Sequence, residues 1–357
     1  MLSWTALLLG LVGVVLASAL ALAVATSRWL PGLQGYRWVW PTLADRSLLY
    51  STPWYGFLPH LVRAPVVGDA EPSRLLHVHL SGTFSHPVFS SSFLESCAKR
   101  NGHHTIGLAY RYSFIPSGLV GKGIRELYAD DEDAQAEAIR AFHETVVFGG
   151  PKTTLTQAVS EADSVEGRLR SALHHLASNY PREGWQYFLQ EKKDAQGRCF
   201  VRWDRIVLSG HSQGGAHAAY LASVLPLRRV VLLSAPQSIP SITKSFVAQP
   251  MATKDVMAFA HEHEDQIDSI KDALNLLGVL KDSNVVNVDE LCDWDASKFL
   301  TCKALFSTVP PGNKLRIRPE HASVAIDVVA PKVKGKSLYA QTVWPYLTSF
   351  AEDSKRE

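Results

Sequence analysis

The sequence predicts an α/β protein built around a mostly parallel sheet. From residue 73 onward, short apolar runs that fit buried strands alternate with longer stretches that have the periodicity of helices. The strand-like runs are continuously apolar, which is typical of parallel strands that are covered by helices on both faces. A length of 357 residues suits one large domain of this kind.

The expected elements follow one another in a regular order. Strands are predicted at 75–80, 105–110, 206–208, 230–233, 256–260 and 305–306. Helices are predicted at 90–100, 130–146, 165–176, 214–225, 266–279 and 338–351. Residues 111–160 are otherwise irregular, so we expect a partly helical insertion that covers the site. Asp163 and Glu166 have the spacing of a capping box at the start of the third helix.

The N-terminal segment 1–27 is expected to be a transmembrane anchor or a signal peptide. No charged residue occurs in it, and about 20 apolar residues suffice to span a bilayer as a helix. Its length and the absence of a preceding basic residue favour an uncleaved anchor over cleavage near Ala23-Val24-Ala25. An anchor would place the domain on the cytoplasmic side, because basic residues follow the span: Arg28, Arg37 and Arg46. Cleavage would instead lead to secretion.

The remainder divides into a juxtamembrane segment with entry strands, 28–72, and one domain, 73–357.

The net charge of +2 gives no broad basic surface, so nucleic acid is not an expected partner. Four cysteines occur without a C-x-x-C pair, and therefore no metal site is predicted. Cys292 and Cys302 lie close enough in the chain to pair if the domain is exported.

The residues from Gly210 to Gly214 match the pattern G-x-S-x-G around Ser212. The motif follows an apolar strand and opens a small-residue helix, which is the context in which such a serine is a nucleophile. Glycines two residues before and after the serine allow strand and helix to approach closely. Ser212 is therefore the candidate nucleophile.

This region resembles the α/β-hydrolase superfamily, in its serine esterase and lipase-like members. A longer stretch is similar to a little-characterised branch of that superfamily, through Asp163–Leu169, Gly184-Trp185, Gly210–Gly215 and Ser234-Ala235-Pro236. The resemblance covers roughly residues 73–350. It implies the α/β-hydrolase fold and hydrolysis without a cofactor, but it names no substrate.

The order of the partners identifies the base. In this fold the acid follows the serine and the histidine follows the acid. Among the later histidines only His321 lies beyond a suitable acidic cluster, because no Asp or Glu occurs between residues 235 and 254. The acid is expected in the cluster after the 256–260 strand. Asp265 is our choice because aspartate has less rotamer freedom to lose, with Glu264 as the alternative.

An oxyanion hole is expected beside the serine. Two backbone N–H groups usually stabilise the oxygen that becomes negative during acyl transfer. One should belong to Gln213, directly after the nucleophile, and the other to the loop Ser81-Gly82-Thr83. Gly82 permits a tight turn there, and Thr83 is the expected donor.

The predicted activity is hydrolysis of an ester, thioester or amide bond through an acyl-serine intermediate. A small-molecule or lipid-like acyl compound is the expected substrate, and the membrane is the expected partner of the N-terminal helix. The main alternative is a catalytically inactive member of the same fold that serves as a binding module. A redox or peroxidase enzyme on this scaffold is a further possibility that no residue favours.

Overall fold

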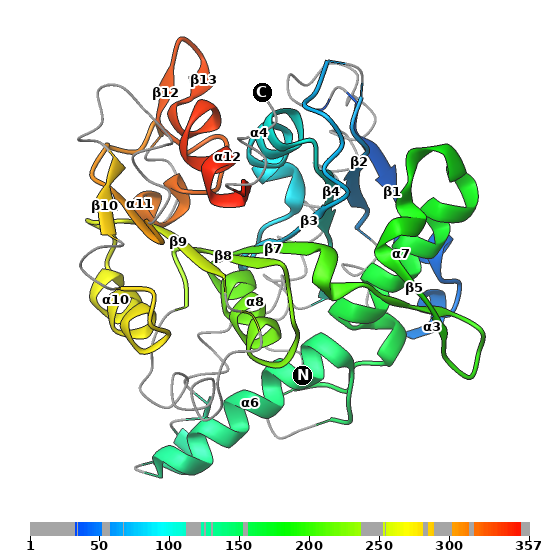
Figure 1. The fold of residues 1–357 in the computed structure, drawn as a ribbon. Coiled ribbons are helices and arrows are strands. Elements are labelled where there is room, and N and C mark those ends of the chain that lie inside the picture. The colour runs from blue at the N-terminus through cyan, green and yellow to red at the C-terminus, as the bar shows by residue number, and fades with distance from the viewer. Residues whose placement is uncertain are drawn as a thin grey trace, which may run out of the picture.

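The central feature of the computed structural model is a nine-stranded sheet with helices on both faces (Figure 1). The structure describes residues 33, 35–51, 58–66, 68–111, 123–124, 126–129, 131–152, 156–236, 253, 255–280, 285–288, 302–313 and 318–350. The predicted membrane segment 1–27 lies outside these ranges. Within them, no helix has both the length and the apolar character that a bilayer span requires.

The sheet has the strand order β1-β2-β4-β3-β7-β8-β9-β11-β10. These strands are β1 (Arg37–Val39), β2 (His60–Arg63), β3 (Leu76–Leu80), β4 (His104–Leu108), β7 (Ile206–His211), β8 (Arg229–Leu233), β9 (Val256–His261), β10 (Val285–Asn287) and β11 (Ala304–Ser307). All neighbours from β4 to β10 are parallel, whereas β1 pairs with β2, and β2 with β4, in an antiparallel manner. The prediction of a mostly parallel sheet is therefore confirmed.

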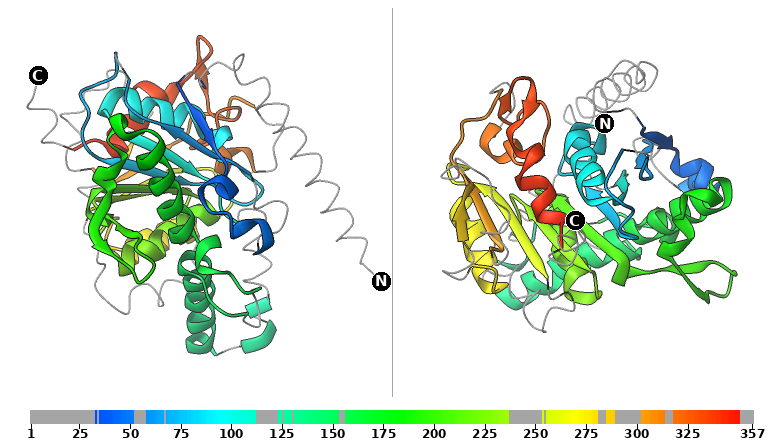
Figure 2. Two further views of the ribbon diagram at one scale, coloured as in Figure 1. Left: turned by 90° about the vertical axis from the view of Figure 1, so that its right-hand side faces the viewer. Right: turned by 45° about the horizontal axis from the view of Figure 1, so that its top comes forward.

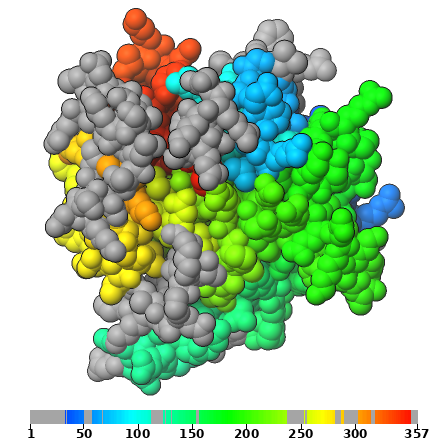
Figure 3. All heavy atoms as spheres, viewed as in Figure 1, coloured from blue at the N-terminus to red at the C-terminus, as the bar shows by residue number. Residues whose placement is uncertain are grey.

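Helices cover the two faces of this sheet. The described helices are α2 (Pro41–Ala44), α3 (Leu48–Ser51), α4 (Ser91–Asn101), α6 (Glu132–Phe148), α7 (Val165–Asn179), α8 (Gln213–Val224), α10 (Ile267–Leu276), α11 (Pro319–Ser323) and α12 (Val343–Thr348). Helices α4 and α12 pack together on one face, whereas α7 and α8 lie on the other (Figures 1 and 2). In Figure 3, the atoms of α6 lie along the lower edge of the face turned to the viewer, and those of α10 lie at its left.

Two apolar cores result, because successive residues of a strand point to opposite faces. In β7, Ile206 and Leu208 belong to the larger core under α7 and α8, while Val207 belongs to the smaller core under α4 and α12. Both cores are closed by large buried aromatic side chains, including Trp185 in the first region and Trp344 in the second. The predicted strands thus read as continuously apolar because both of their faces are buried.

Some elements differ from the expectation. The hairpin of β5 (Leu189–Lys193) and β6 (Cys199–Val201) was not predicted, since β5 is polar and mostly exposed and β6 has only three residues. Helix α7 is capped by Ser164, whose Oγ accepts from the Gly167 N–H, and not by Asp163. The Asp163 side chain is instead buried in an ion pair with Arg168.

The predicted insertion is helical in its described part. Helix α6 packs against α7 and α8 on one face of the sheet, and the ring nitrogens of His143 on α6 and His217 on α8 lie 2.9 Å apart. Residues 112–122 lie outside the described ranges, so the expectation that 111–160 covers the site stays a prediction. Cys302 is described and is a free cysteine. Cys292, with which it could pair, lies outside the described ranges.

Many of the histidines are buried, and burial disfavours the charged form of their side chains. Burial is the main cause that lowers the pKa of each of these side chains: His60, His77, His79, His86, His103, His143 and His217. The pKa falls to about 3 for His79 and to about 4 for His86. In the unfolded chain these groups would take up protons near pH 6.5.

We therefore expect the protein to unfold readily in mild acid. A group whose folded pKa lies below its unfolded value stabilises the fold above the unfolded pKa, and this contribution is lost as the pH falls. Each such histidine weakens the fold by up to about 1.4 kcal/mol per pH unit below pH ~6.5. Urea denaturation at pH values of about 7.5, 6 and 5 should show a steep fall in midpoint. Equal midpoints at the three values would contradict the buried neutral state.

Candidate active site

The candidate nucleophile lies on a strained turn between β7 and α8. Ser212 has φ 54° and ψ −121°, a conformation that non-glycine residues seldom adopt. Its N–H donates to the Leu233 carbonyl at 3.0 Å, which ties the turn to the end of β8. Ser212 is half-buried, whereas both of its neighbours in the chain are buried. The turn therefore presents this residue at the carboxyl end of the sheet, where open α/β sheets hold their ligands.

The glycines of the motif are required by close packing. A Cβ at Gly210 would lie 2.2 Å from the Gly214 carbonyl oxygen, and a Cβ at Gly214 would lie 2.2 Å from that of Leu80. A Cβ at Gly215 would lie 2.3 Å from the Ala235 Cβ. Such distances exclude any side chain without movement of the backbone, so the three glycines fix how β7, α8 and β3 meet.

His321 lies close to this turn, in the short helix α11. Its Nδ1–H donates to Glu264 Oε2 at 2.5 Å, which leaves Nε2 as the nitrogen that can accept a proton. Nε2 is buried and has no hydrogen-bond partner among the described residues. The ring lies 5.0 Å from that of His211, whose Nε2 donates to the His321 carbonyl at 2.9 Å. His321 is thus held beside the residue that precedes Ser212.

The carboxylate on His321 belongs to Glu264, and the expectation of Asp265 in that place is corrected. Glu264 is 3% exposed, and its Oε1 accepts from Ser234 Oγ at 2.7 Å and from the His261 N–H at 3.3 Å. The Asp265 side chain is 63% exposed and pairs with Arg318 at 2.6 Å.

The reason lies in the turn that follows β9. The Glu264 N–H donates back to the His261 carbonyl at 3.1 Å, which turns this side chain inward immediately after the strand. The next residue then points outward into solvent. The longer glutamate side chain crosses the remaining gap to α11, which a preference for aspartate based on rotamer entropy did not anticipate.

The two residues predicted to form the oxyanion hole are joined through their side chains. Thr83 Oγ1 donates to Gln213 Oε1 at 2.6 Å. A Cβ at Gly82 would lie 3.0 Å from the Ser212 Cβ, so the loop passes directly against the serine. The Ser85 N–H donates to the Gly82 carbonyl at 3.2 Å and closes a turn around Thr83. The structure therefore brings the predicted loop and the predicted serine together.

Several residues near the site were missed by sequence reasoning. Tyr110 OH donates to the Ser81 carbonyl at 2.7 Å and supports the start of the loop Ser81-Gly82-Thr83. Phe84 follows Thr83 with φ 53° and is 37% exposed. Ser234 was noted only as part of a similar stretch, with no role assigned. No local pattern distinguishes Tyr110 and Ser234, since each is placed by a contact with a distant part of the chain.

Three further buried histidines make hydrogen bonds within the fold. His77 Nε2 and His79 Nδ1 both contact Ser209 Oγ, at 2.7 and 2.9 Å, beneath the oxyanion loop. His261 Nε2 donates to the Val309 carbonyl at 3.0 Å. In the described part of the chain, no group of three His, Cys, Asp or Glu side chains is arranged to hold a metal ion.

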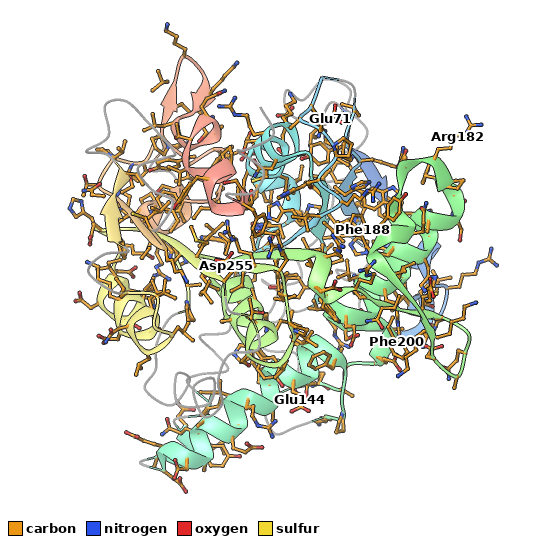
Figure 4. The ribbon with its side chains drawn as sticks, viewed as in Figure 1. Glu71, Glu144, Arg182, Phe188, Phe200 and Asp255 are labelled. Atoms are coloured by element: carbon orange, nitrogen blue, oxygen red, sulfur yellow. The ribbon has the colours of Figure 1, made fainter. Side chains whose placement is uncertain are left out.

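The site lies at one end of the parallel strands. Ser212, Ser234 and Glu264 each follow the carboxyl end of a neighbouring strand, β7, β8 or β9. Asp255, labelled in Figure 4, precedes β9 and marks the opposite end, where it pairs with Arg229 at 2.7 Å. The candidate residues are therefore contributed by three successive strands and by α11.

Comparison with known proteins gives solved structures only. No protein-family model matches the chain, and a search of curated proteins found no similar sequence. Esterase B from Lactobacillus rhamnosis is 13% identical and matches 99% of this chain and 94% of its own, with a TM-score of 0.41. An esterase from Pyrobaculum calidifontis is 15% identical over 62% and 68% of the two chains, with a TM-score of 0.30. Esterase PE8 is 15% identical over 69% and 88%, with a TM-score of 0.34.

These scores are low, and the assignment of the fold rests on the structure itself. The parallel sheet, the strained turn at Ser212 between strand and helix, and the chain order of Ser212, Glu264 and His321 are the features that identify it. The chain has the fold of the α/β hydrolases.

Proposed function

We propose that the protein is a serine hydrolase that cleaves an ester, thioester or amide bond through an acyl-serine intermediate. The observation that carries the proposal is the Glu264–His321 pair beside the strained turn of Ser212. A buried carboxylate on Nδ1 holds the imidazole in the tautomer whose Nε2 can take a proton. No metal or cofactor is needed for this chemistry.

In the proposed reaction, Ser212 Oγ attacks the carbonyl carbon of the substrate. His321 Nε2 removes the serine proton and then delivers it to the leaving group. The Glu264 carboxylate stabilises the imidazolium that forms in between. A water molecule, deprotonated by the same nitrogen, then attacks the acyl-serine and releases the acid product. Contact between Ser212 Oγ and His321 is expected to tighten when substrate binds, as is common at such sites.

The N–H groups of Gln213 and Thr83 are proposed to stabilise the oxyanion. The hydrogen bond between their side chains supports this assignment, because it keeps the two backbone segments in a fixed relation. Preorganised donors of this kind are worth about 3 kcal/mol each in the transition state. A small-molecule or lipid-like acyl compound is the proposed substrate.

The test is a panel of p-nitrophenyl esters of increasing chain length, together with a fluorophosphonate probe. We expect hydrolysis of at least the short esters and a covalent adduct at Ser212, located by mass spectrometry of the labelled peptide. A properly folded protein that neither reacts with the probe nor hydrolyses any ester, thioester or amide would favour the alternative of an inactive binding module.

We also propose that residues 2–27 attach the domain to a membrane, from their apolar composition alone. The full-length chain should then remain with membranes after extraction with alkaline carbonate. A chain that lacks residues 1–27 should be released while it keeps its esterase activity. Complete extraction of an uncleaved full-length chain would exclude the anchor.

A further inference from the structure

The end of strand β8 contacts two members of the candidate triad at once. The Leu233 carbonyl accepts the hydrogen bond from the Ser212 N–H at 3.0 Å. The next residue, Ser234, donates from Oγ to Glu264 Oε1 at 2.7 Å. Both Ser234 and the Glu264 side chain are shielded from solvent, at 0% exposure. One dipeptide therefore connects the backbone of the nucleophile to the carboxylate of the acid.

The two oxygens of Glu264 have separate tasks. Among the described residues, Oε2 accepts from His321 alone, whereas Oε1 accepts from Ser234 Oγ and from the His261 N–H. The hydrogen bond from the His261 N–H is the longer of the two, at 3.3 Å, so the Ser234 hydroxyl is the closer donor to Oε1. In a buried site such charge-assisted bonds are stronger than in water.

A glutamate needs this additional hold more than an aspartate would. Its side chain has one more rotatable bond, and each free torsion lets the carboxylate leave the plane in which it can accept from the imidazole. The hydrogen bonds that Ser234 Oγ and the His261 N–H donate to Oε1 fix the last side-chain torsion of Glu264, which orients its carboxylate. The carboxylate is then aligned with Nδ1 before substrate binds.

The backbone of Ser234 is strained in the conformation that makes this contact. Its φ is 46°, in the left-handed region that residues other than glycine avoid. Its N–H donates to the Phe259 carbonyl at 2.9 Å, which binds the residue to β9. Strain held in place by surrounding structure often marks a residue that positions a functional group.

We propose that Ser234 is a positioning residue that fixes the carboxylate of Glu264 for its work on His321. The inference rests on the proposed hydrolase function and extends it beyond the three residues of the triad. Ser234 does not touch the substrate. Its loss should therefore lower kcat and leave KM unchanged, since the alignment of the base affects the chemical step and not binding.

Two substitutions separate positioning from folding. Ser234→Ala removes the hydroxyl and keeps the strain, whereas Ser234→Gly removes both. Each should lower kcat for a short p-nitrophenyl ester by about 10- to 100-fold with KM unchanged, and the glycine variant should melt no lower than the alanine variant. Ser96→Ala is the matched control, because Ser96 is also buried and donates to a carbonyl, that of Phe93, away from the site. It should keep wild-type kcat.

A double-mutant cycle with Glu264→Gln decides whether Ser234 acts through Glu264. In that background Ser234→Ala should change kcat by less than about twofold, because the group that it positions has already been altered. An equal loss in both backgrounds, or wild-type kcat in Ser234→Ala or Ser234→Gly, would overturn the inference. Full activity in Glu264→Gln itself would instead remove Glu264 from the proposed mechanism, a result that is distinct from the failure of Ser234 alone.

Discussion

Ser212→Ala should lower kcat for ester hydrolysis by a factor on the order of 10⁶. The loss is this large because a water molecule in place of the serine is poorly aligned and the acyl-enzyme route disappears. The variant should remain folded, because alanine has one atom fewer and the turn is tied by the backbone bond to Leu233. Initial rates on a p-nitrophenyl ester, with labelling by a fluorophosphonate, measure both effects.

Ser223→Ala provides the control for this experiment. Ser223 lies on the same helix, α8, and its hydroxyl donates to the Tyr220 carbonyl at 2.7 Å, well away from the turn. This variant should label and turn over like the wild type. Substantial hydrolysis by Ser212→Ala would show that another group is the nucleophile.

Glu264→Gln should lower kcat by a factor of up to about 10⁴. The amide keeps the shape of the side chain, but its NH₂ group can face Nδ1, which then favours the tautomer with the proton on Nε2. His321 could no longer accept the proton of Ser212. The Glu264 side chain is buried and accepts three hydrogen bonds from described residues. We expect so large a loss of activity because water cannot reach this position and take over the role of the carboxylate.

Asp265→Asn is the matched control on the adjacent residue. The Asp265–Arg318 pair is exposed, and such pairs contribute only about 0–1 kcal/mol. Its kcat should remain within roughly fivefold of wild type. Steady-state kinetics of Asp265→Asn and Glu264→Gln, measured under the same conditions, show which carboxylate the reaction needs. A crippled Asp265→Asn beside an active Glu264→Gln would reverse the assignment of the acid.

Most of the sheet could be predicted because its strands are buried on both faces. Runs such as those in β8 and β9 have no polar face, whereas the helices between strands carry polar residues on one side. This difference in pattern distinguishes the strands from the helices. The serine turn could be predicted for a related reason, since the glycines around Ser212 are required by backbone contacts. Strand β5 is mostly exposed, and β6 has only three residues, so the sequence of this hairpin carries little such constraint.

The identity of the acid could be narrowed to the turn after β9 but not to one residue. Glu264 and Asp265 are adjacent carboxylates, and local propensities favour the aspartate. The choice between them depends on which side chain faces α11, and that is decided by contacts with Ser234 and His321 that lie 30 and 57 positions away in the chain. The same holds for Ser234, whose role exists only once β8 and β9 are paired.

The position of β3 in the sheet has a consequence for biosynthesis. This strand leaves the ribosome well before β7, yet it lies between β4 and β7, and its partners in β7 follow about 130 residues later, as for His79 and Ser209. Until β7 emerges, one edge of β3 is open and its buried polar groups have no partner. Such long-range parallel pairing forms slowly and leaves nascent chains prone to aggregation. Newly made chains of this protein should therefore depend on chaperones more than their size alone would suggest.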